Sequence, residues 1–215
     1  MPAPHYVAPM QTHAPRLAPL VLATMASQAL LVTLSPTIVA IGKDLGASVG
    51  AVGQARSVAA SVAIIASLAI VGHVDALGVR RLLSVGAALA IVACAAVGLA
   101  PTLAVFLAAH MLVGLGLACL LSAGFAGVAA FPPERRAWAI GYVAGANALA
   151  WVVVNPVVRA MTEWLSWRVA EVVPAGIARR AEFEDAAEPD HGWGGVAADG
   201  NQALAAGMDE GGAYE

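Results

Sequence analysis

Residues 82–133 read LLSVGAALAIVACAAVGLAPTLAVFLAAHMLVGLGLACLLSAGFAGVAAFPP, and this stretch contains no Lys, Arg, Asp or Glu. A helix needs about 20 mostly apolar residues to cross ~30 Å of hydrocarbon, so the stretch is long enough for two crossings. Pro101, near its centre, cannot donate a helical hydrogen bond. We therefore predict two transmembrane helices joined by a very short turn.

Other uncharged windows lie on either side of this stretch. They run from Arg16 to Lys43, from Arg56 to Asp75 and from Arg136 to Arg159. Each is close to the length of one membrane span. The sequence therefore predicts an all-α, polytopic membrane protein, because a helix satisfies its own backbone polar groups in lipid. The five predicted spans cover roughly residues 17–41, 53–73, 82–100, 103–130 and 138–160.

The composition supports a membrane protein with a separate tail. Hydrophobic residues make up 60% of the chain and charged residues 12%, compared with about 25% charged in soluble domains. Residues 1–162 hold eight basic and three acidic residues, whereas residues 163–215 hold three basic and eleven acidic ones. We expect three parts: a disordered cytoplasmic tail (1–16), a five-helix bundle (17–162) and an Ala/Gly-rich acidic tail that is disordered (163–215).

The positive charges predict the orientation of the spans, because cytoplasmic loops carry an excess of Lys and Arg. With the N-terminus inside, five arginines lie on the cytoplasmic side, and only Lys43 and Arg56 lie toward the outer side. We therefore expect a multi-pass protein of the cell inner (plasma) membrane with a cytoplasmic N-terminus. Five spans would place residues 163–215 outside. The five inner arginines are Arg16, Arg80, Arg81, Arg135 and Arg136.

Between the second and third predicted spans lies a short charged loop, VGHVDALGVRRLL, at residues 71–83. Gly78 suits the positive φ of a sharp reversal. Asp75 can accept from free N–H groups at the start of the next helix or pair with Arg80. Turn chemistry and membrane topology alone can explain such a loop, and Arg81 fits that interpretation equally well.

The order Asp75-x-x-Gly78-x-Arg80 resembles the signature between helices two and three of the major facilitator superfamily. The fit is partial, because Val71 stands where the family has its first glycine, and Ala76 replaces a basic residue. The resemblance implies a gating loop, in which Asp75, Gly78, Arg80 and Arg81 change contacts between inward-open and outward-open states.

Further stretches resemble this family in the same order along the chain. Residues 34–48 are similar to the first helix end and outer loop of drug and sugar efflux branches, and residues 131–137 are similar to an inner loop. Gly141, Gly145 and Asn155-Pro156 resemble the fifth-helix antiporter motif, although Asn155 replaces a glycine. Trp167-Arg168 matches the start of helix six, where the resemblance ends. It implies proton-coupled efflux of a small-molecule substrate across a lipid bilayer.

Three polar residues inside predicted spans are candidates for proton coupling or for the pore. His110 stands where proton-coupled members of the family have an arginine, and an ionisable group at membrane depth is a candidate functional site. A structural histidine bonded within the bundle is the alternative. Gln28 on the first helix and Asn147 on the fifth could line a substrate path, or could hold helices together.

Family members have two bundles, whereas this sequence predicts five spans. We expect a truncated or frame-shifted chain that is inactive alone and needs a second half or a homodimer. The alternative is a small non-transporting membrane protein that binds partners in a complex. No catalytic group, metal-ligand cluster or phosphate loop points to an enzyme or to a cofactor. The few basic residues are not interleaved with aromatic ones, so the sequence does not predict binding of nucleic acid.

Overall fold

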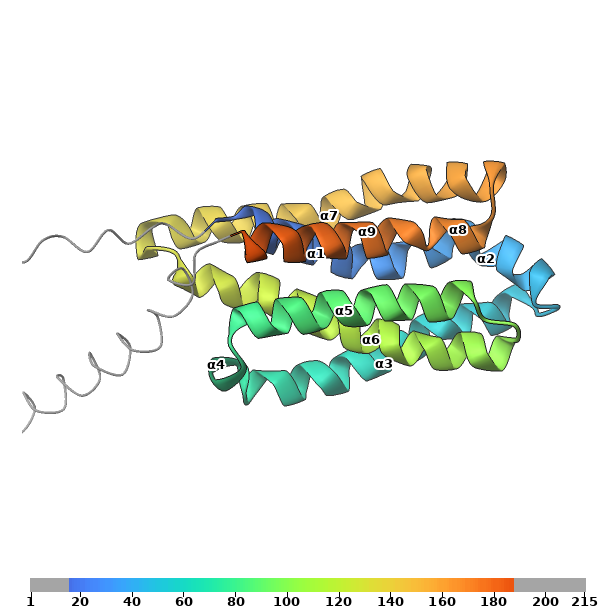
Figure 1. Ribbon diagram of the computed structural model, residues 1–215, viewed down its shortest axis with the longest axis horizontal. Helices are drawn as coiled ribbons and strands as arrows, with labels where there is room; N and C mark the ends of the chain where they lie inside the picture. Colours follow the sequence, from blue (N-terminus) through green and yellow to red (C-terminus); the bar gives the residue numbers. More distant parts are fainter. Residues whose placement is uncertain (1–15, 188–215) are drawn as a thin grey trace, which may run out of the picture.

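The computed structural model describes residues 16–187, with the side chain of Asp75 excepted, and this part of the chain is helical without any strand. The long helices run side by side along one axis (Figure 1). Their bounds are α1 Ala18–Val32, α2 Leu34–Asp44, α3 Val49–Val71, α4 Val74–Leu77, α5 Val79–Gly98, α6 Leu103–Ala126, α7 Pro133–Trp164, α8 Trp167–Ala170 and α9 Val172–Ala186, with a 3₁₀ turn, η1, at Gly127–Ala130.

Five helical stretches of the described chain are long and apolar enough to cross a membrane, as the sequence predicts. They are Ala18–Asp44, Val49–Val71, Val79–Gly98, Leu103–Ala130 and Pro133–Trp164. The predicted break at Pro101 separates α5 from α6, and Thr102 caps α6 by accepting a hydrogen bond from the Val105 N–H at 3.4 Å. The fold class is therefore an all-α, multi-pass membrane bundle.

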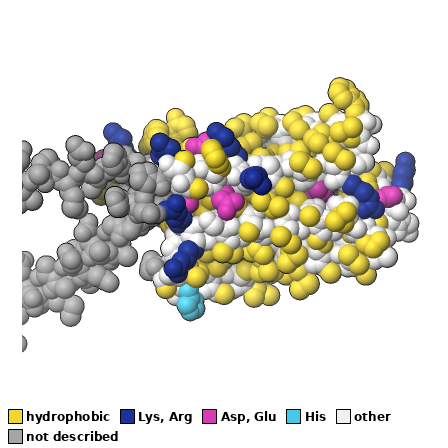
Figure 2. Space-filling model, viewed as in Figure 1, with side chains coloured by type: hydrophobic (Ala, Val, Ile, Leu, Met, Phe, Trp, Pro, Cys, Tyr) yellow, Lys and Arg dark blue, Asp and Glu magenta, His cyan; other side chains and the backbone are white. Residues whose placement is uncertain are grey.

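The two ends of the bundle differ, and each has a name below. The α4 end holds α4 and the start of α7 at Pro133, whereas the Asp44 end holds the end of α2 and the turn between α5 and α6 (Figure 1). Hydrophobic side chains cover most of the face in Figure 2, with charged side chains mainly toward the two ends. This distribution suits a bundle whose middle lies in hydrocarbon.

Small residues bring the helices of the core together. A Cβ added at Gly86 of α5 would lie 2.9 Å from Leu120 Cγ on α6. One added at Gly114 of α6 would meet the carbonyl oxygen of Ala59 on α3. Small residues at helix contacts allow such close approach in membrane proteins. Gly86 of α5 and Gly114 of α6 thus serve helix packing.

The tail predicted to be disordered is helical over α8 and α9, so that prediction is wrong for residues 167–186. α9 packs against α1 and α5. Its buried residues Pro174, Ala178, Ala181 and Asp185 recur every three or four positions and so form one face of a helix. The expectation of disorder came from the content of charged residues, which reflects the other, exposed face of this helix. Residues 1–15 and 188–215, where the remaining disorder was predicted, lie outside the described chain.

Because α8 and α9 return along the bundle, residue 187 lies at the same end as residue 16 (Figure 1). The five-span count had placed everything after residue 163 on the opposite side. α9 has 15 residues, and five of its last eight, Arg179–Ala186, are charged. Hydropathy alone therefore does not detect it as a further segment of the bundle.

Candidate functional site

The charged loop of residues 71–83 forms the reversal between α3 and α5 at the α4 end. Gly78 ends α4 with φ of 75°, a conformation that favours glycine. Arg80 Nε lies 3.6 Å from Asp185 Oδ2, and the Asp185 side chain is 2% exposed. Arg81 is exposed, and Asp75 belongs to α4. The last turn of α9 therefore contacts the loop that the sequence singles out.

His110 lies in the core of the bundle on α6. Its side chain is 5% exposed, and Nδ1 donates to the carbonyl oxygen of Phe106 at 2.8 Å. The ring of Phe106 packs on the imidazole with 4.5 Å between centroids, and it meets Trp167 edge-on. The imidazole thus has a hydrogen-bond partner within its own helix and aromatic neighbours.

The other two pore candidates, Gln28 and Asn147, are half-buried on α1 and α7. The Oδ1 atom of Asn147 is buried without a hydrogen-bond partner among the described residues. Within the part of the chain that the structure describes, no hydrogen bond joins Gln28, His110 and Asn147 to one another. On α1 it is Thr24 that reaches α7, where its Oγ1 donates to the Val143 carbonyl oxygen at 3.3 Å.

The fifth-helix motif occupies two parts of α7. Gly141 and Gly145 face open space, since a Cβ added at either would meet nothing within 4 Å. Pro156 lies inside the helix, and Asn155 Nδ2 donates to the carbonyl oxygen of Trp151 at 3.0 Å. Asn155 and Pro156 border a recess of about 570 Å³ between α2 and α7. The recess is lined by Pro36, Asn155, Pro156, Arg159, Thr162 and Glu163.

Arg56, which the sequence places only as an outer charge, reaches from α3 to the junction of α1 and α2. Its Nη2 donates to the Leu31 carbonyl oxygen at 3.0 Å and to Ser35 Oγ at 2.8 Å. Its guanidinium carbon lies 5.8 Å from the ring centroid of Trp151 on α7. The side chain is exposed in this bundle. Its position inside a predicted span, at residues 53–73, is the sequence signal that could have singled it out.

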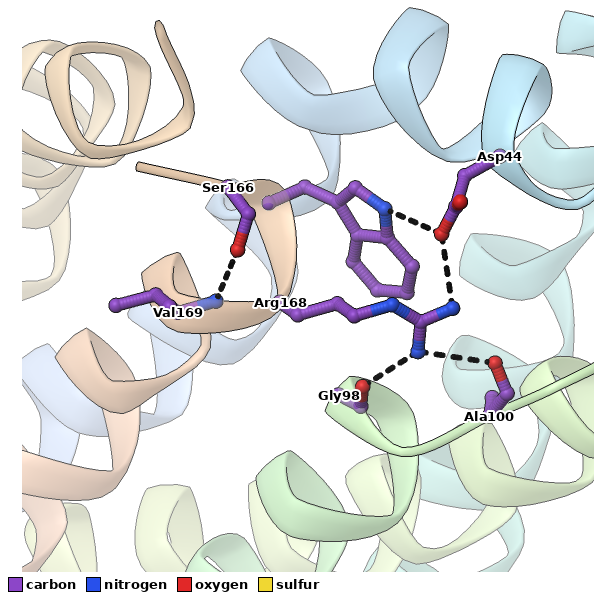
Figure 3. A network of polar contacts seen from close by, with 7 residues as sticks. Asp44, Gly98, Ala100, Ser166, Arg168 and Val169 are labelled. Carbon is purple, nitrogen blue, oxygen red and sulfur yellow. Dashed lines mark hydrogen bonds and ion pairs between the residues drawn. The ribbon is translucent and has the colours of Figure 1, made fainter. Parts of the chain in front are cut away.

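At the Asp44 end, Trp167 and Arg168 tie three segments together (Figure 3). Arg168 Nη1 donates to the carbonyl oxygens of Gly98 at 2.6 Å and Ala100 at 3.1 Å. Arg168 Nη2 and Trp167 Nε1 donate to Asp44 Oδ2 at 2.8 and 3.1 Å. The sequence marks Trp167-Arg168 as a family match but contains no sign that Asp44 is their partner.

Comparison with known proteins places this bundle in a family. The family model for the Major Facilitator Superfamily matches residues 20–178. This match extends ten residues past Arg168, where the motif resemblance ends. A search of curated proteins finds no match. Among solved structures, the chain is similar to that titled as the proton:xylose symporter XylE bound to 6-bromo-6-deoxy-D-glucose, with a TM-score of 0.69 and 14% identity.

That alignment covers 80% of this chain and 44% of the symporter, so the chain spans less than half the length of the transporter it matches. At 14% identity the likeness concerns the fold. The match to the family description covers well over half of the chain and rests on the sequence itself. This protein belongs to the Major Facilitator Superfamily, whose members are membrane transporters of small molecules.

Proposed function

We propose that this chain is the N-terminal bundle of a proton-coupled efflux transporter for a small molecule, and that it transports only when paired with a second bundle. We base this proposal on one observation: the described helices form one bundle that corresponds to 44% of a symporter of the same fold. Alternating access in such transporters requires two bundles that rock around a shared site.

Two helices of this bundle leave their apolar faces uncovered. Within the apolar, membrane-spanning window of α3, 17% of the residues are buried, and within that of α7, 28% are buried. The corresponding share for the span that contains α6 is 56%. α3 exposes Ile64, Ile65 and Leu68. The open glycines of α7, Gly141 and Gly145, would let another helix approach closely. These faces suit a second bundle, which is either a separate half or a second copy of this chain.

The direction and the coupling ion are inferred from the motifs. The antiporter-like motif of α7 puts Asn155 and Pro156 beside a recess that a substrate could enter. His110 is the ionisable group in the interior of α6 and is our candidate for proton coupling. Members of this family work in a lipid bilayer, and we assign the chain to the cell inner membrane with its α4 end in the cytoplasm, where Arg80, Arg81 and Arg135 lie.

The gating loop would act through the contact between Arg80 and Asp185. At 3.6 Å, with Arg80 37% exposed, this ion pair is close enough to hold the loop and open enough to separate. We assign Asp75, Gly78 and Arg81 to the same gating loop, whose contacts would change during the transport cycle. For a substitution of Arg80, the matched control is a substitution of Arg135, an exposed arginine at the same end of the bundle.

The experiment is reconstitution of the purified chain into liposomes that enclose a pH-sensitive dye, at a protein density that keeps it monomeric. A panel of small organic acids, cationic dyes and neutral sugars is added under an imposed pH gradient. We expect no compound-dependent proton flux from the monomer. Flux should appear when the chain is cross-linked as a dimer or fused to a second bundle, and Arg80→Gln should abolish it while Arg135→Gln retains it.

Coupled flux by the monomer would contradict the need for a second bundle. A different result would favour the non-transporting alternative: no paired form carries flux, and the chain instead forms a stable complex with another membrane protein. In that case substitution of Asp75 or His110 would leave the complex intact.

A further inference from the structure

We propose that Arg56 binds the carboxylate of the transported molecule, at the edge of the recess between α2 and α7. This inference rests on the proposed transport function and adds the chemical class of its substrate. Arg56 comes seven residues after Val49, the first residue of α3, which places it about 10 Å along the helix at about 1.5 Å per residue. A charge at such depth is costly unless it faces a polar or wet cavity.

The contacts of Arg56 hold its guanidinium in place without neutralising it. Both hydrogen bonds come from Nη2, and both acceptors, the Leu31 carbonyl and the Ser35 hydroxyl, are uncharged. Among residues 16–187, no hydrogen bond is made by Nε or Nη1 of Arg56, and no carboxylate lies within ion-pair distance of it. Nε and Nη1 therefore still have N–H donors for a negatively charged group.

Arg56 does not itself line the recess, but the residues it contacts adjoin residues that do. Ser35, which accepts from Arg56, precedes the recess-lining Pro36 in α2. Trp151, whose ring lies 5.8 Å from the guanidinium, is one turn from Asn155, which donates to its carbonyl oxygen. Arg56 and the recess thus share the same two walls, α2 and α7.

The charges around the recess leave Arg56 as the uncompensated one. Arg159 and Glu163 both line the recess, and they pair with each other at 2.8 Å between Nε and Oε1. Arg56 has no such partner among the described residues. The net positive charge at this site selects an anion over a neutral or cationic ligand.

A carboxylate fits these groups better than other small anions attached to an apolar body. A carboxylate oxygen can accept a charge-assisted hydrogen bond from the free N–H groups of Nη1 or from Nε–H. The indole of Trp151 offers an apolar face beside the charge. A volume of about 570 Å³ is in the range of small-molecule sites. We therefore expect a small organic acid with a hydrophobic part.

The experiment measures tryptophan emission of the purified full chain in detergent during titration with cyclohexanecarboxylate. The matched probe is cyclohexanecarboxamide, which has the same shape and no charge, and the ionic strength is held constant. We expect a saturable change with the carboxylate and none with the amide. Arg56→Lys should weaken the apparent affinity about tenfold, because one ammonium group cannot replace both the Nη2 contacts and the free donors on Nε and Nη1. Arg56→Gln should abolish the response.

Arg179→Gln is the matched control, since Arg179 is an exposed arginine of α9 remote in sequence from the recess walls, and it should keep the response. Equal responses to acid and amide, no response to either, or a response retained in Arg56→Gln would overturn the proposal. If Arg56→Gln fails to fold, the comparison of acid with amide on the unaltered chain still decides. Binding is measured without flux, so failed transport and failed carboxylate binding are separate results.

Discussion

Arg168 stabilises the Asp44 end of the bundle by donating to carbonyl groups that the end of α5 and the following turn leave without helical partners. Its second partner, Asp44, is 46% exposed, so solvent screens that ion pair. The two kinds of contact can therefore be separated by substitution. The carbonyl contacts should contribute more to stability than the ion pair.

We predict that Arg168→Gln lowers the free energy of unfolding by about 1–3 kcal/mol, because two carbonyl groups lose a charged donor. Asp44→Asn should cost about 0–1 kcal/mol, as screened surface pairs do. Denaturation of the two variants in mixed detergent micelles, followed by circular dichroism, gives both values. If Asp44→Asn is the more costly variant, the ion pair and not the carbonyl contacts holds this end together.

At the scale of elements, glycines of neighbouring helices have opposite environments. The Gly114 position on α6 is filled by α3, with Val62 Cβ 2.9 Å from an added Cβ, whereas the Gly141 position on α7 is open. Both are glycines in apolar helices, and the sequence offers no distinction between them. They form a matched pair for separating packing within the bundle from packing against a second bundle.

We predict that Gly114→Ala destabilises the purified chain by about 1–3 kcal/mol through overpacking. Gly141→Ala should leave its stability unchanged or raise it by up to about 1 kcal/mol, as the loss of a helical glycine does. In the paired form, Gly141→Ala should instead reduce cross-linking between bundles. Equal destabilisation of the isolated chain by both substitutions would show that α7 packs against this bundle through its glycines.

At the scale of the whole molecule, α8 and α9 bring the chain back to the end where it enters the bundle (Figure 1). Position 187 and position 16 should therefore be on the same side of the membrane. Single cysteines are placed at these two positions after Cys94 and Cys119 are replaced by serine, and a membrane-impermeant maleimide is applied to intact cells. We expect the same labelling at both positions, and labelling at position 187 alone would restore the five-span arrangement.

The candidate site was only partly predictable from the sequence. The chain reversal at Gly78 depends on residues close to it in sequence, and so does the position of Asn155 and Pro156 within α7. The structure has both features where the motifs indicate. The roles of Asp75, Arg81 and the other motif residues stay predictions. Gln28, His110 and Asn147 were grouped because they are polar within apolar spans, but the side-chain geometry does not join them.

The sequence by itself determined the number, order and approximate limits of the five spans, because the bilayer imposes a length and an apolar character that each segment shows on its own. Only the tertiary structure decided that α9 packs between α1 and α5, that Arg168 bonds Asp44 from 124 residues away, and that Arg56 bonds Leu31 and Ser35 at the junction of α1 and α2. These contacts depend on which helix faces meet, and that is a property of the packed bundle and not of any one segment.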